Sequence, residues 1–310
     1  MLEIFKTVDN ELIKTDSFEE GVWVNLAAPV PQEISQVGSA LNVDPDFLRA
    51  ALDEEERARI ETDDGTTLIV FDIPVLNSDV RDAIYETIPL AVILIKHTIV
   101  TVCLREDTLL KDFMNKKVKS FLTQYKTRFV LQILYKTSAR YLQYLKQIDK
   151  ASSRVEQDLH KSMKNKELIQ MLKLEKSLVY FSTALKSNEV VLEKLLKHEH
   201  IKNYPDDADL LEDVIVENKQ AIEMATIYSS ILSGTMDAFA SVISNNLNIV
   251  MKFLTSVTIL MAIPTMISSF FGMNVNLPLA GNQLAFLFII LISLIVCVFA
   301  GVALYKKKMF

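Results

Sequence analysis

Charge is missing from one long stretch of this sequence. From Phe253 to Tyr305 there are 53 consecutive residues without Asp, Glu, Lys, Arg or His, and all 72 acidic and basic residues lie outside it. The chain as a whole has a mean hydropathy of +0.23, although 23% of its 310 residues are charged. A normal charge content beside a high hydropathy means that the apolar residues are concentrated in one segment. This excludes a wholly soluble protein and also a carrier with most of its mass in lipid.

Other features are scarce too, and each shortage excludes a class of protein. The two cysteines, Cys103 and Cys297, are too few for a disulfide framework or a cysteine metal site. The net charge of −6 argues against a nucleic-acid partner, which would need a basic face to neutralise phosphates. No nucleotide-binding loop, dinucleotide fingerprint or Ser–His–Asp set is present, so we expect neither an organic cofactor nor an enzyme. The N-terminus lacks the apolar core of a signal peptide, which predicts a cytoplasmic N-terminal part.

The first 105 residues alternate β-type runs with helical signals. Asp44 and Pro45 are the typical cap and first residue of a helix. Short runs rich in β-formers are bounded by turn residues, and the pattern predicts a compact α/β domain over residues 1–105 with a mostly buried sheet. The candidate strands are residues 21–26, residues 66–73 ended by Pro74, and a hairpin of 88–95 and 98–104.

Helix-breaking residues then become rare. Gly is absent between Gly65 and Gly234, and Pro is absent between Pro89 and Pro205. Apolar residues recur at spacings of three and four, which is typical of helices. We therefore expect a long antiparallel helical pair over residues 106–204, with a break at 161–166.

After Pro205 the apolar spacing alternates four and three, as in the seam of a helix that packs against other helices. We expect a stalk helix over residues 205–252, capped by Asp206 or Asp207, that continues into the apolar block as far as Phe271. The predicted seam comprises Leu211, Ile215, Asn218, Ile222, Ala225, Ser229, Leu232, Met236, Phe239 and Ile243.

The apolar block contains two segments of membrane-spanning length. Residues 253–271 and 284–305 each come near the ~20 residues that a spanning helix needs. Residues 272–283 form a short external loop between them, and residues 306–310 form a basic tail. Lysines at Lys252 and in this tail place both termini on the cytoplasmic side by the positive-inside rule.

The two spans differ in their side chains. The first carries small and hydroxylated residues at helical spacing on one face and bulky residues on the opposite face. Such a face can serve close helix–helix packing in the membrane, or it can line a water-filled pore built from several copies. The small and polar face comprises Asn248, Met251, Leu254, Thr258, Ala262, Thr265, Ser269 and Gly272, and the bulky face Phe253, Val257, Leu260, Ile267 and Phe271.

The end of the first span carries a motif. Gly272-Met273-Asn274 between two C-terminal spans, followed by a lysine cluster, resembles the CorA family of magnesium channels. The resemblance covers the whole chain. It implies a funnel-shaped homopentamer in the cytoplasmic membrane, with an α/β cytosolic domain, a long α-helical stalk and two transmembrane helices. It also implies uptake of Mg²⁺, and of Co²⁺ or Ni²⁺, driven by the electrochemical gradient and gated by cytosolic Mg²⁺.

The resemblance further implies roles for single residues. Gly272, Met273 and Asn274 match the ion-selectivity loop, Asn248 an asparagine ring at the cytoplasmic end of the pore, and Leu254 a hydrophobic constriction. The next constriction, often Met, falls on Ala262. A pore face without charge suits Mg²⁺, which keeps its waters and must be released again.

One departure from the family leaves the ion open. Residues 275–279 read Val-Asn-Leu-Pro-Leu, without the acid that many members carry there. A zinc-transporting branch of similar architecture is therefore the alternative to a magnesium channel. A membrane-anchored coiled-coil scaffold is the alternative from another class, although it does not explain a polar stripe that ends at Gly-Met-Asn.

Six acids crowd residues 206–217 without a base. They can favour a helix N-terminus, or they can form a cytosolic Mg²⁺ sensor between subunits, since carboxylates are ligands for hard cations. By the resemblance, Asp213 matches a sensing aspartate of the stalk, with Asp209 and Glu212 beside it. The partner position of the N-terminal domain aligns near Ala50, which cannot bind metal, so the nearby Asp46, Asp53 and Glu54 are the candidate substitutes.

Overall fold

The computed structural model describes residues 1–77, 83–162, 165–197, 205–273 and 284–309. The chain divides into two compact units, Met1–Gly234 and Thr235–Phe310. Helix α7 (Pro205–Phe271) belongs to both units, and its 67 residues form one helix. The predicted continuation of the stalk into the first span is thereby confirmed.

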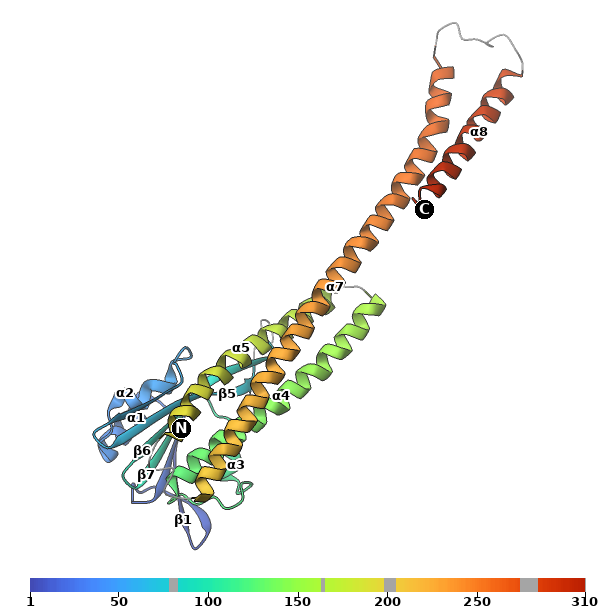
Figure 1. Ribbon diagram of the computed structural model, residues 1–310. Coiled ribbons are helices and arrows are strands. Elements are labelled where there is room, and N and C mark those ends of the chain that lie inside the picture. The colour runs from blue at the N-terminus through green and yellow to red at the C-terminus, as the bar shows by residue number, and fades with distance from the viewer. Residues whose placement is uncertain (78–82, 163–164, 198–204, 274–283, 310) are drawn as a thin grey trace. The chain divides into compact units, whose positions relative to one another are not determined.

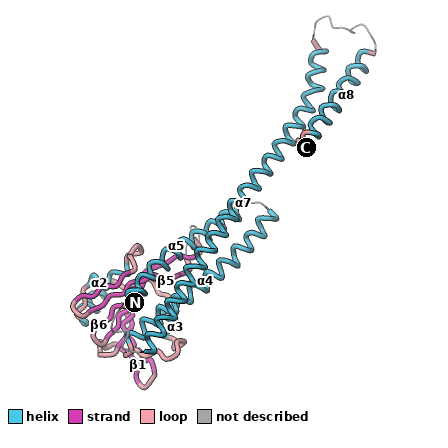
Figure 2. Tube along the Cα trace, in the orientation of Figure 1, coloured by secondary structure: helices cyan, strands magenta, loops and turns pink. Residues whose placement is uncertain are grey.

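One mixed sheet forms the centre of the first unit. Its seven described strands have the order β2-β1-β3-β7-β6-β5-β4, and every neighbouring pair is antiparallel except β3 and β7. Strand β3 is buried along its whole length because both faces of the sheet are covered (Figure 2). The strands are β1 (Leu2–Val8), β2 (Glu11–Thr15), β3 (Val22–Ala27), β4 (Arg59–Asp63), β5 (Thr66–Leu76), β6 (Tyr85–Ile95) and β7 (Thr98–Cys103).

Two layers of helices cover the sheet (Figure 1). Helices α1, α2 and the short η1 contribute to one apolar core, and α3, α4, α5 and the start of α7 contribute to the core on the opposite face. Asp44 caps α2 by accepting a hydrogen bond from the Asp46 N–H at 2.9 Å, as predicted. The helices besides α7 are α1 (Pro31–Leu41), α2 (Pro45–Arg49), η1 (Ala50–Leu52), α3 (Thr108–Met114), α4 (Lys126–Ser162), α5 (Asn165–Leu196) and α8 (Ala285–Lys306).

Strand β5 runs through Pro74, whereas the sequence predicted that this proline would end it. Strand β4 pairs only with residues 66–70 of β5, which leaves the rest of that edge without a neighbouring strand. The Asp72 N–H points to this free edge and donates to Asn188 Oδ1 of α5 at 2.8 Å. Pro74 lies two residues further and presents its nitrogen to the same side. It therefore costs no hydrogen bond of the sheet, and the strand continues.

Helix α5 closes the free edge of the sheet with side chains. Asn188 also donates from Nδ2 to the Asp72 carbonyl at 2.8 Å, so it satisfies both backbone groups of that residue. At the start of β6, which β7 does not reach, Ser177 of α5 accepts hydrogen bonds from the N–H groups of Ile84 and Tyr85 at 3.2 and 3.0 Å. Buried backbone groups need partners, and here a helix supplies them where a further strand would.

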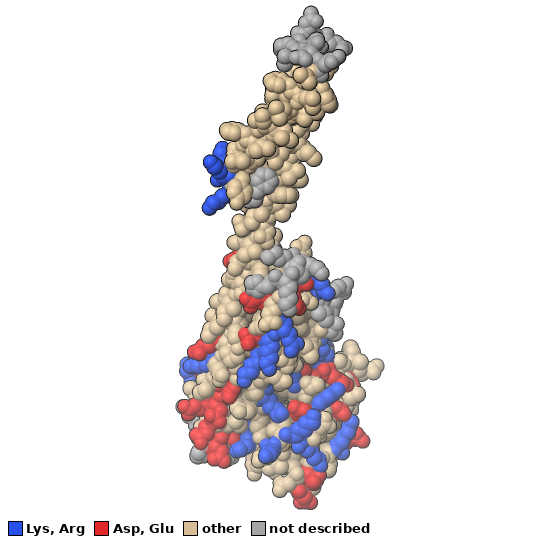
Figure 3. All heavy atoms as spheres, turned by 90° about the vertical axis from the view of Figure 1, so that its right-hand side faces the viewer, with Lys and Arg blue, Asp and Glu red and all other residues tan. Residues whose placement is uncertain are grey.

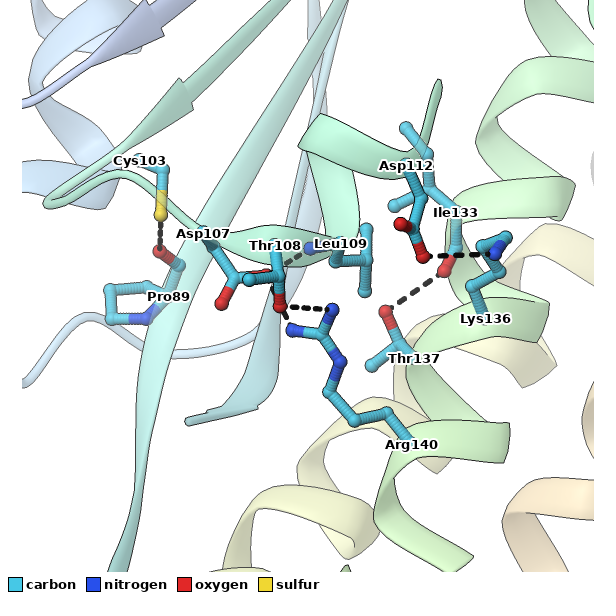
Figure 4. A network of polar contacts seen from close by, with 10 residues as sticks. All are labelled: Pro89, Cys103, Asp107, Thr108, Leu109, Asp112, Ile133, Lys136, Thr137 and Arg140. Carbon is cyan, nitrogen blue, oxygen red and sulfur yellow. Dashed lines mark hydrogen bonds and ion pairs between the residues drawn. The ribbon is translucent and has the colours of Figure 1, made fainter. Parts of the chain in front are cut away.

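Helix α3 is separate and short, and the first long helix begins at Lys126 rather than near Asp107. The Asp107 carboxylate caps α3 by accepting from the Leu109 N–H at 2.7 Å, and it also pairs with Arg140 of α4 (Figure 4). Arg140 donates to Thr108 Oγ1 at 3.0 Å as well. Both charged side chains are nearly buried, so loss of either would leave the other without compensation. This pair fixes the short helix to α4.

The predicted seam of α7 is half confirmed. Every seventh position is buried, but the positions between them are only half covered, and Val214 and Ala221 are buried in their place. Residues three and four positions after a seam residue lie on either side of it on a helix, and near Leu211 and Asn218 the buried side is the one with Val214 and Ala221. The buried seam positions are Leu211, Asn218, Ala225, Leu232 and Phe239, and the half-covered ones are Ile215, Ile222, Ser229, Met236 and Ile243.

Asp72 gives the first unit a predictable pH dependence. Its side chain shares a face of β5 with the buried Leu68 and Val70, and burial raises its pKa from 3.8 to about 6. The fold therefore keeps the proton that the unfolded chain loses, and its stability falls as pH rises from about 4 to about 6. We expect Asp72→Asn to be more stable than the parent chain at pH 7.5, by about 3 kcal/mol, with little difference near pH 4.

The buried Trp23 can report this change, since it is the one tryptophan and lies in the sheet. Melting followed by its fluorescence, in the detergent-solubilised full chain between pH 4 and 8, is the measurement. Asp64→Asn at the exposed β4–β5 turn is the control and should alter melting little at any pH. If the melting temperatures of Asp72→Asn and the parent chain differ by the same amount at every pH in this range, the raised pKa of Asp72 is contradicted.

Candidate ion pathway and regulatory acids

Helix α8 packs along one face of α7 within the second unit (Figure 1). Ser256 of α7 is fully buried there, and its Oγ lies 3.2 Å from the Met309 carbonyl just beyond α8. Gly301 of α8 faces the Leu260 side chain. The half-covered residues on the same side of α7 are Val257, Leu260, Ile263, Pro264 and Ile267.

A proline inside α7 creates the central contact between the two helices. Pro264 has no N–H, so the Leu260 carbonyl oxygen lacks the donor that a regular helix would supply. Cys297 of α8 donates its Sγ–H to that oxygen at 3.3 Å. An unsatisfied carbonyl is costly in lipid, so this bond ties α8 to one side of α7. The proline and the cysteine are visible in the sequence, but the bond between Cys297 and Leu260, which are 37 residues apart, was not predicted.

The predicted pore face of α7 lies away from this contact. All its described side-chain positions are exposed in the single chain, from Asn248 at one end to Ser269 at the other. The hydroxyls of Thr258 and Thr265 donate to the carbonyls of Leu254 and Met261, at 2.8 and 3.0 Å. Each hydroxyl oxygen keeps a lone pair with which it can accept a further hydrogen bond. The exposed set is Asn248, Met251, Leu254, Thr258, Ala262, Thr265 and Ser269.

The bulky face predicted opposite to it is only partly covered. Val257, Leu260 and Ile267 lie on the side of α8, while Phe253 and Phe271 remain exposed. In the described part of the chain, α7 and α8 are long and apolar enough to cross a membrane. Figure 3 shows this segment free of charged side chains except for a basic cluster at one end.

The Gly-Met-Asn segment begins where α7 ends. The Gly272 N–H donates to the Ser268 carbonyl at 2.9 Å, and the Met273 N–H to the Phe270 carbonyl at 3.4 Å. Asn274 lies outside the described residues.

The structure separates the acids that the sequence proposed as a regulatory site. Asp209, Glu212 and Asp213 are exposed on α7, on the sheet face that carries α4 and α5. The helix α2 and η1 lie on the opposite face, and Asp46, Asp53 and Glu54 are exposed there. Among the described residues no group of three potential ligands is close enough to hold a metal ion. One chain alone therefore does not bring the two sets together.

The first acids of α7 have a structural role. The helix begins at Pro205, so Asp206 and Asp207 lie in its first turn, and the prediction that one of them caps the helix is wrong. Both approach Arg128 of α4, with N–O distances of 3.8 and 3.7 Å. Burial raises the pKa of Asp207, and Arg128 opposes that shift. These residues line a pocket of about 1040 Å³ whose other walls are the segment between α3 and α4, the start of α4 and the β1–β2 turn residue Asn10.

Comparison with known proteins identifies the family. The model of the family described as CorA-like Mg²⁺ transporter protein matches residues 18–308. The chain belongs to this family. The CorA-like family is one of ion transporters, so the chain is a membrane transporter and not an enzyme, and Mg²⁺ is the substrate of its family.

Individual relatives agree with this membership. The cobalt/magnesium transport protein CorA of Methanocaldococcus jannaschii is 27% identical over 302 residues, 94% of this chain and 92% of its own length. The complete structure of the CorA magnesium transporter from that organism has a TM-score of 0.82, covers 99% of this chain and 98% of its own, and is 24% identical. The ZntB cytoplasmic domain from Vibrio parahaemolyticus has a TM-score of 0.61 over 79% of this chain and 96% of that domain, at 11% identity. These two structures are similar in fold.

The Leu260–Cys297 bond can be tested by a pair of substitutions. We expect Cys297→Val to lower the free energy of unfolding in mixed detergent micelles by about 1 kcal/mol, because the Leu260 carbonyl loses its donor. Cys297→Ser, which keeps a donor, should cost less. In a Pro264→Ala background the backbone N–H returns to that carbonyl, and Cys297→Val should then cost little. If Cys297→Val lowers the free energy of unfolding equally with Pro264 and with Ala at position 264, the thiol acts only through its volume.

Proposed function

We propose that this chain forms a homopentameric channel that admits Mg²⁺, and also Co²⁺ or Ni²⁺, across the cytoplasmic membrane. In this proposal α7 of each copy lines the pore and cytosolic Mg²⁺ closes it. The position of α8 carries the proposal, since it packs against one side of α7 and leaves the uncharged polar face uncovered.

Two spans cannot enclose a pore, so the polar face needs further copies around it. The part of α7 in the first unit supports such an assembly, because it exposes large apolar side chains beyond its buried seam. Val216, Ile227 and Ile231 are 58%, 55% and 59% exposed. Apolar side chains left exposed at helical spacing on one face favour packing against another helix.

The chemistry of the uncharged face favours a hydrated cation. Mg²⁺ dehydrates reluctantly and is held through its waters, and the amide of Asn248 and the hydroxyls of Thr258 and Thr265 can hydrogen-bond those waters. A charged ring would bind the ion harder and release it more slowly. An inside-negative potential would drive entry with about 4.6 kcal/mol per divalent ion at 100 mV, twice the ~2.3 kcal/mol of a single charge.

The proposed orientation places both ends of the membrane pair on the cytoplasmic side. Lys252 precedes the first span and Lys306, Lys307 and Lys308 follow the second, as the positive-inside rule requires of cytoplasmic flanks. The loop with Gly272, Met273 and Asn274 would then face outward and select the ion.

The regulatory acids favour a sensor shared between copies. Since the sheet separates Asp213 from Asp46, Asp53 and Glu54 within one chain, a Mg²⁺ ion that uses both sets must bridge two chains. Ala50 is buried and carries no ligand atom, so the acids around it are the candidates. A bridging Mg²⁺ ion would stabilise the closed assembly only to the extent that it binds the closed state more tightly than the open one.

The zinc alternative rests on the loop sequence, which lacks an acid at residues 275–279. The likeness to the ZntB domain concerns fold, at 11% identity, and zinc transport remains the alternative substrate. A scaffold without transport leaves the uncovered polar face of α7 without a role.

Ion flux into proteoliposomes that contain the full chain tests the proposal. We expect an inside-negative potential to drive Mg²⁺ and Co²⁺ influx that exceeds Zn²⁺ influx. Asn274→Ala should abolish most of this flux. With Thr265→Cys, a water-soluble thiol reagent should block the flux, because the introduced thiol faces the pore.

Val257→Cys is the matched control for that block, since this position lies on the side of α8. If the reagent blocks both variants to the same extent, the predicted polar face of α7 does not line the pore. If folded Asn274→Ala protein conducts as well as the parent chain, the loop has no role in ion selection. If Zn²⁺ influx exceeds Mg²⁺ influx, zinc is the favoured substrate.

Regulation is tested with amides in place of the acids. We expect the combined change Asp209→Asn, Glu212→Gln and Asp213→Asn to raise the internal Mg²⁺ concentration for half-inhibition by about tenfold, the effect of losing ~1.4 kcal/mol of binding. The preference among external ions should stay the same, because the selectivity loop is untouched. Glu223→Gln on the same helix is the control. Unchanged inhibition would mean that the sensor lies elsewhere.

A further inference from the structure

Four lysines lie at one end of the membrane pair formed by α7 and α8. They are the only basic residues of the second unit, and Asp237 is its only acid. Asp237 precedes Lys252 by 15 residues on α7, about 22 Å along the helix, and is too far away to pair with it. Figure 3 shows this basic cluster at the end of the uncharged segment. We call these four exposed residues the lysine cluster: Lys252, Lys306, Lys307 and Lys308.

The chain turns sharply where α8 ends. The Met309 N–H donates to the Leu304 carbonyl at 3.1 Å. The Lys308 N–H donates to the Tyr305 carbonyl at 3.0 Å, and Lys308 has a positive φ of 53°. This combination is a Schellman turn, which ends a helix and leads the chain away from its axis. The lysines at this end of α8 therefore belong to a hydrogen-bonded turn and not to a loose tail.

Ser256 holds this turn against α7. Its hydroxyl, which has a single proton to donate, lies between the Lys252 carbonyl at 2.8 Å and the Met309 carbonyl at 3.2 Å. The side chain is fully buried, so water does not compete for this contact. Residues four positions apart share a face of a helix, and Lys252 therefore lies on the side of α7 that meets the turn. The fold thus gathers lysines from both helices at one place.

The lysine cluster has no counter-charge of its own. Within the described residues, none of its members takes part in an ion pair. Like charges that the fold holds together repel one another, and an anion supplied from outside relieves this repulsion. The chain offers the site, but the anion must come from another molecule.

The surroundings of the lysine cluster indicate where that anion comes from. Tyr305 and Phe253 are exposed directly beside the lysines, and aromatic side chains at the end of a span are typical of the headgroup level of a membrane. Phe299 and Val302 are exposed seven and four positions before Lys306, on the same face of α8. An anion that also carries acyl chains would cover this apolar surface, whereas a free phosphate would not.

We propose that the lysine cluster binds the phosphate group of an anionic phospholipid, whose acyl chains lie along α8 and whose headgroup joins the ends of the two helices. Clustered lysines next to a spanning helix attract anionic lipids. A phosphatidylcholine headgroup carries its own cation beside the phosphate and gains less from a cluster that has no acid. The proposal requires only that the pair spans a membrane. The proposed orientation decides which leaflet supplies the lipid, namely the cytoplasmic one.

Native mass spectrometry of the full-length protein tests this site. The protein is released from mixed micelles that contain phosphatidylglycerol and phosphatidylcholine in equal amounts, and the lipids that it retains are counted. We expect the parent chain to retain phosphatidylglycerol preferentially. Each lysine strengthens the attraction about fivefold, so removal of the cluster should lower phosphatidylglycerol retention at least tenfold and leave phosphatidylcholine retention unchanged. The combined variant is Lys252→Gln, Lys306→Gln, Lys307→Gln and Lys308→Asn, since Asn tolerates a positive φ.

A control variant loses the same number of charges from the first unit. It should retain phosphatidylglycerol as the parent chain does. Unchanged phosphatidylcholine retention and an unchanged melting curve of Trp23 fluorescence show that both variants are folded. The control changes four exposed lysines to glutamine: Lys186, Lys194, Lys197 and Lys219.

Ser256→Ala distinguishes a bound lipid from a general attraction to a charged surface. This variant keeps every lysine but frees the turn after α8, so we expect it to retain phosphatidylglycerol several-fold less well than the parent chain. Retention equal to that of the parent chain would mean that the lysines attract the membrane diffusely, and the site would be overturned. Displacement of phosphatidylglycerol by inorganic phosphate would make the cluster a site for a free anion and would equally overturn the lipid.

Two further results bear on the proposal as a whole. Equal retention of the two lipids by the parent chain, or equal phosphatidylglycerol retention by the cluster variant and the control, overturns the lipid site and leaves the proposed channel intact. A parent chain that prefers phosphatidylglycerol but conducts no divalent cation in proteoliposomes overturns the channel and leaves the lipid site intact.

Discussion

The membrane part of this protein depends on one demand of the lipid, namely that every backbone carbonyl finds a donor. Pro264 removes the donor of the Leu260 carbonyl, and Cys297 replaces it from α8. That bond decides on which side of α7 the second span lies. The opposite side, with Thr258 and Thr265, is left for ions or for further copies of the chain.

The first unit solves the same problem in a different way. Strand β5 extends beyond its neighbour β4, and the exposed backbone of Asp72 is satisfied by Asn188 of α5. Because α5 is used to close this edge, it turns its other face, with Leu172 and Val190, to solvent.

The proposed sensor follows from this arrangement rather than from the acids alone. Asp213 projects from the face that α7 shares with α4 and α5, while Asp53 lies beyond the opposite core. The sheet that separates them also sets the condition for sensing, since only contact between copies can bring them together.

The sequence by itself determined the spans, the polar face and the continuous stalk, because hydropathy and helical spacing are local properties. It also predicted the cap at Asp44 and the Gly-Met-Asn segment that begins at Gly272. Only the tertiary structure decided that β5 passes through Pro74, that Asp107 joins Arg140, and that Cys297 serves Leu260. Each of these depends on backbone groups far apart in the chain, whose partners are set by how the elements pack and not by their own residues.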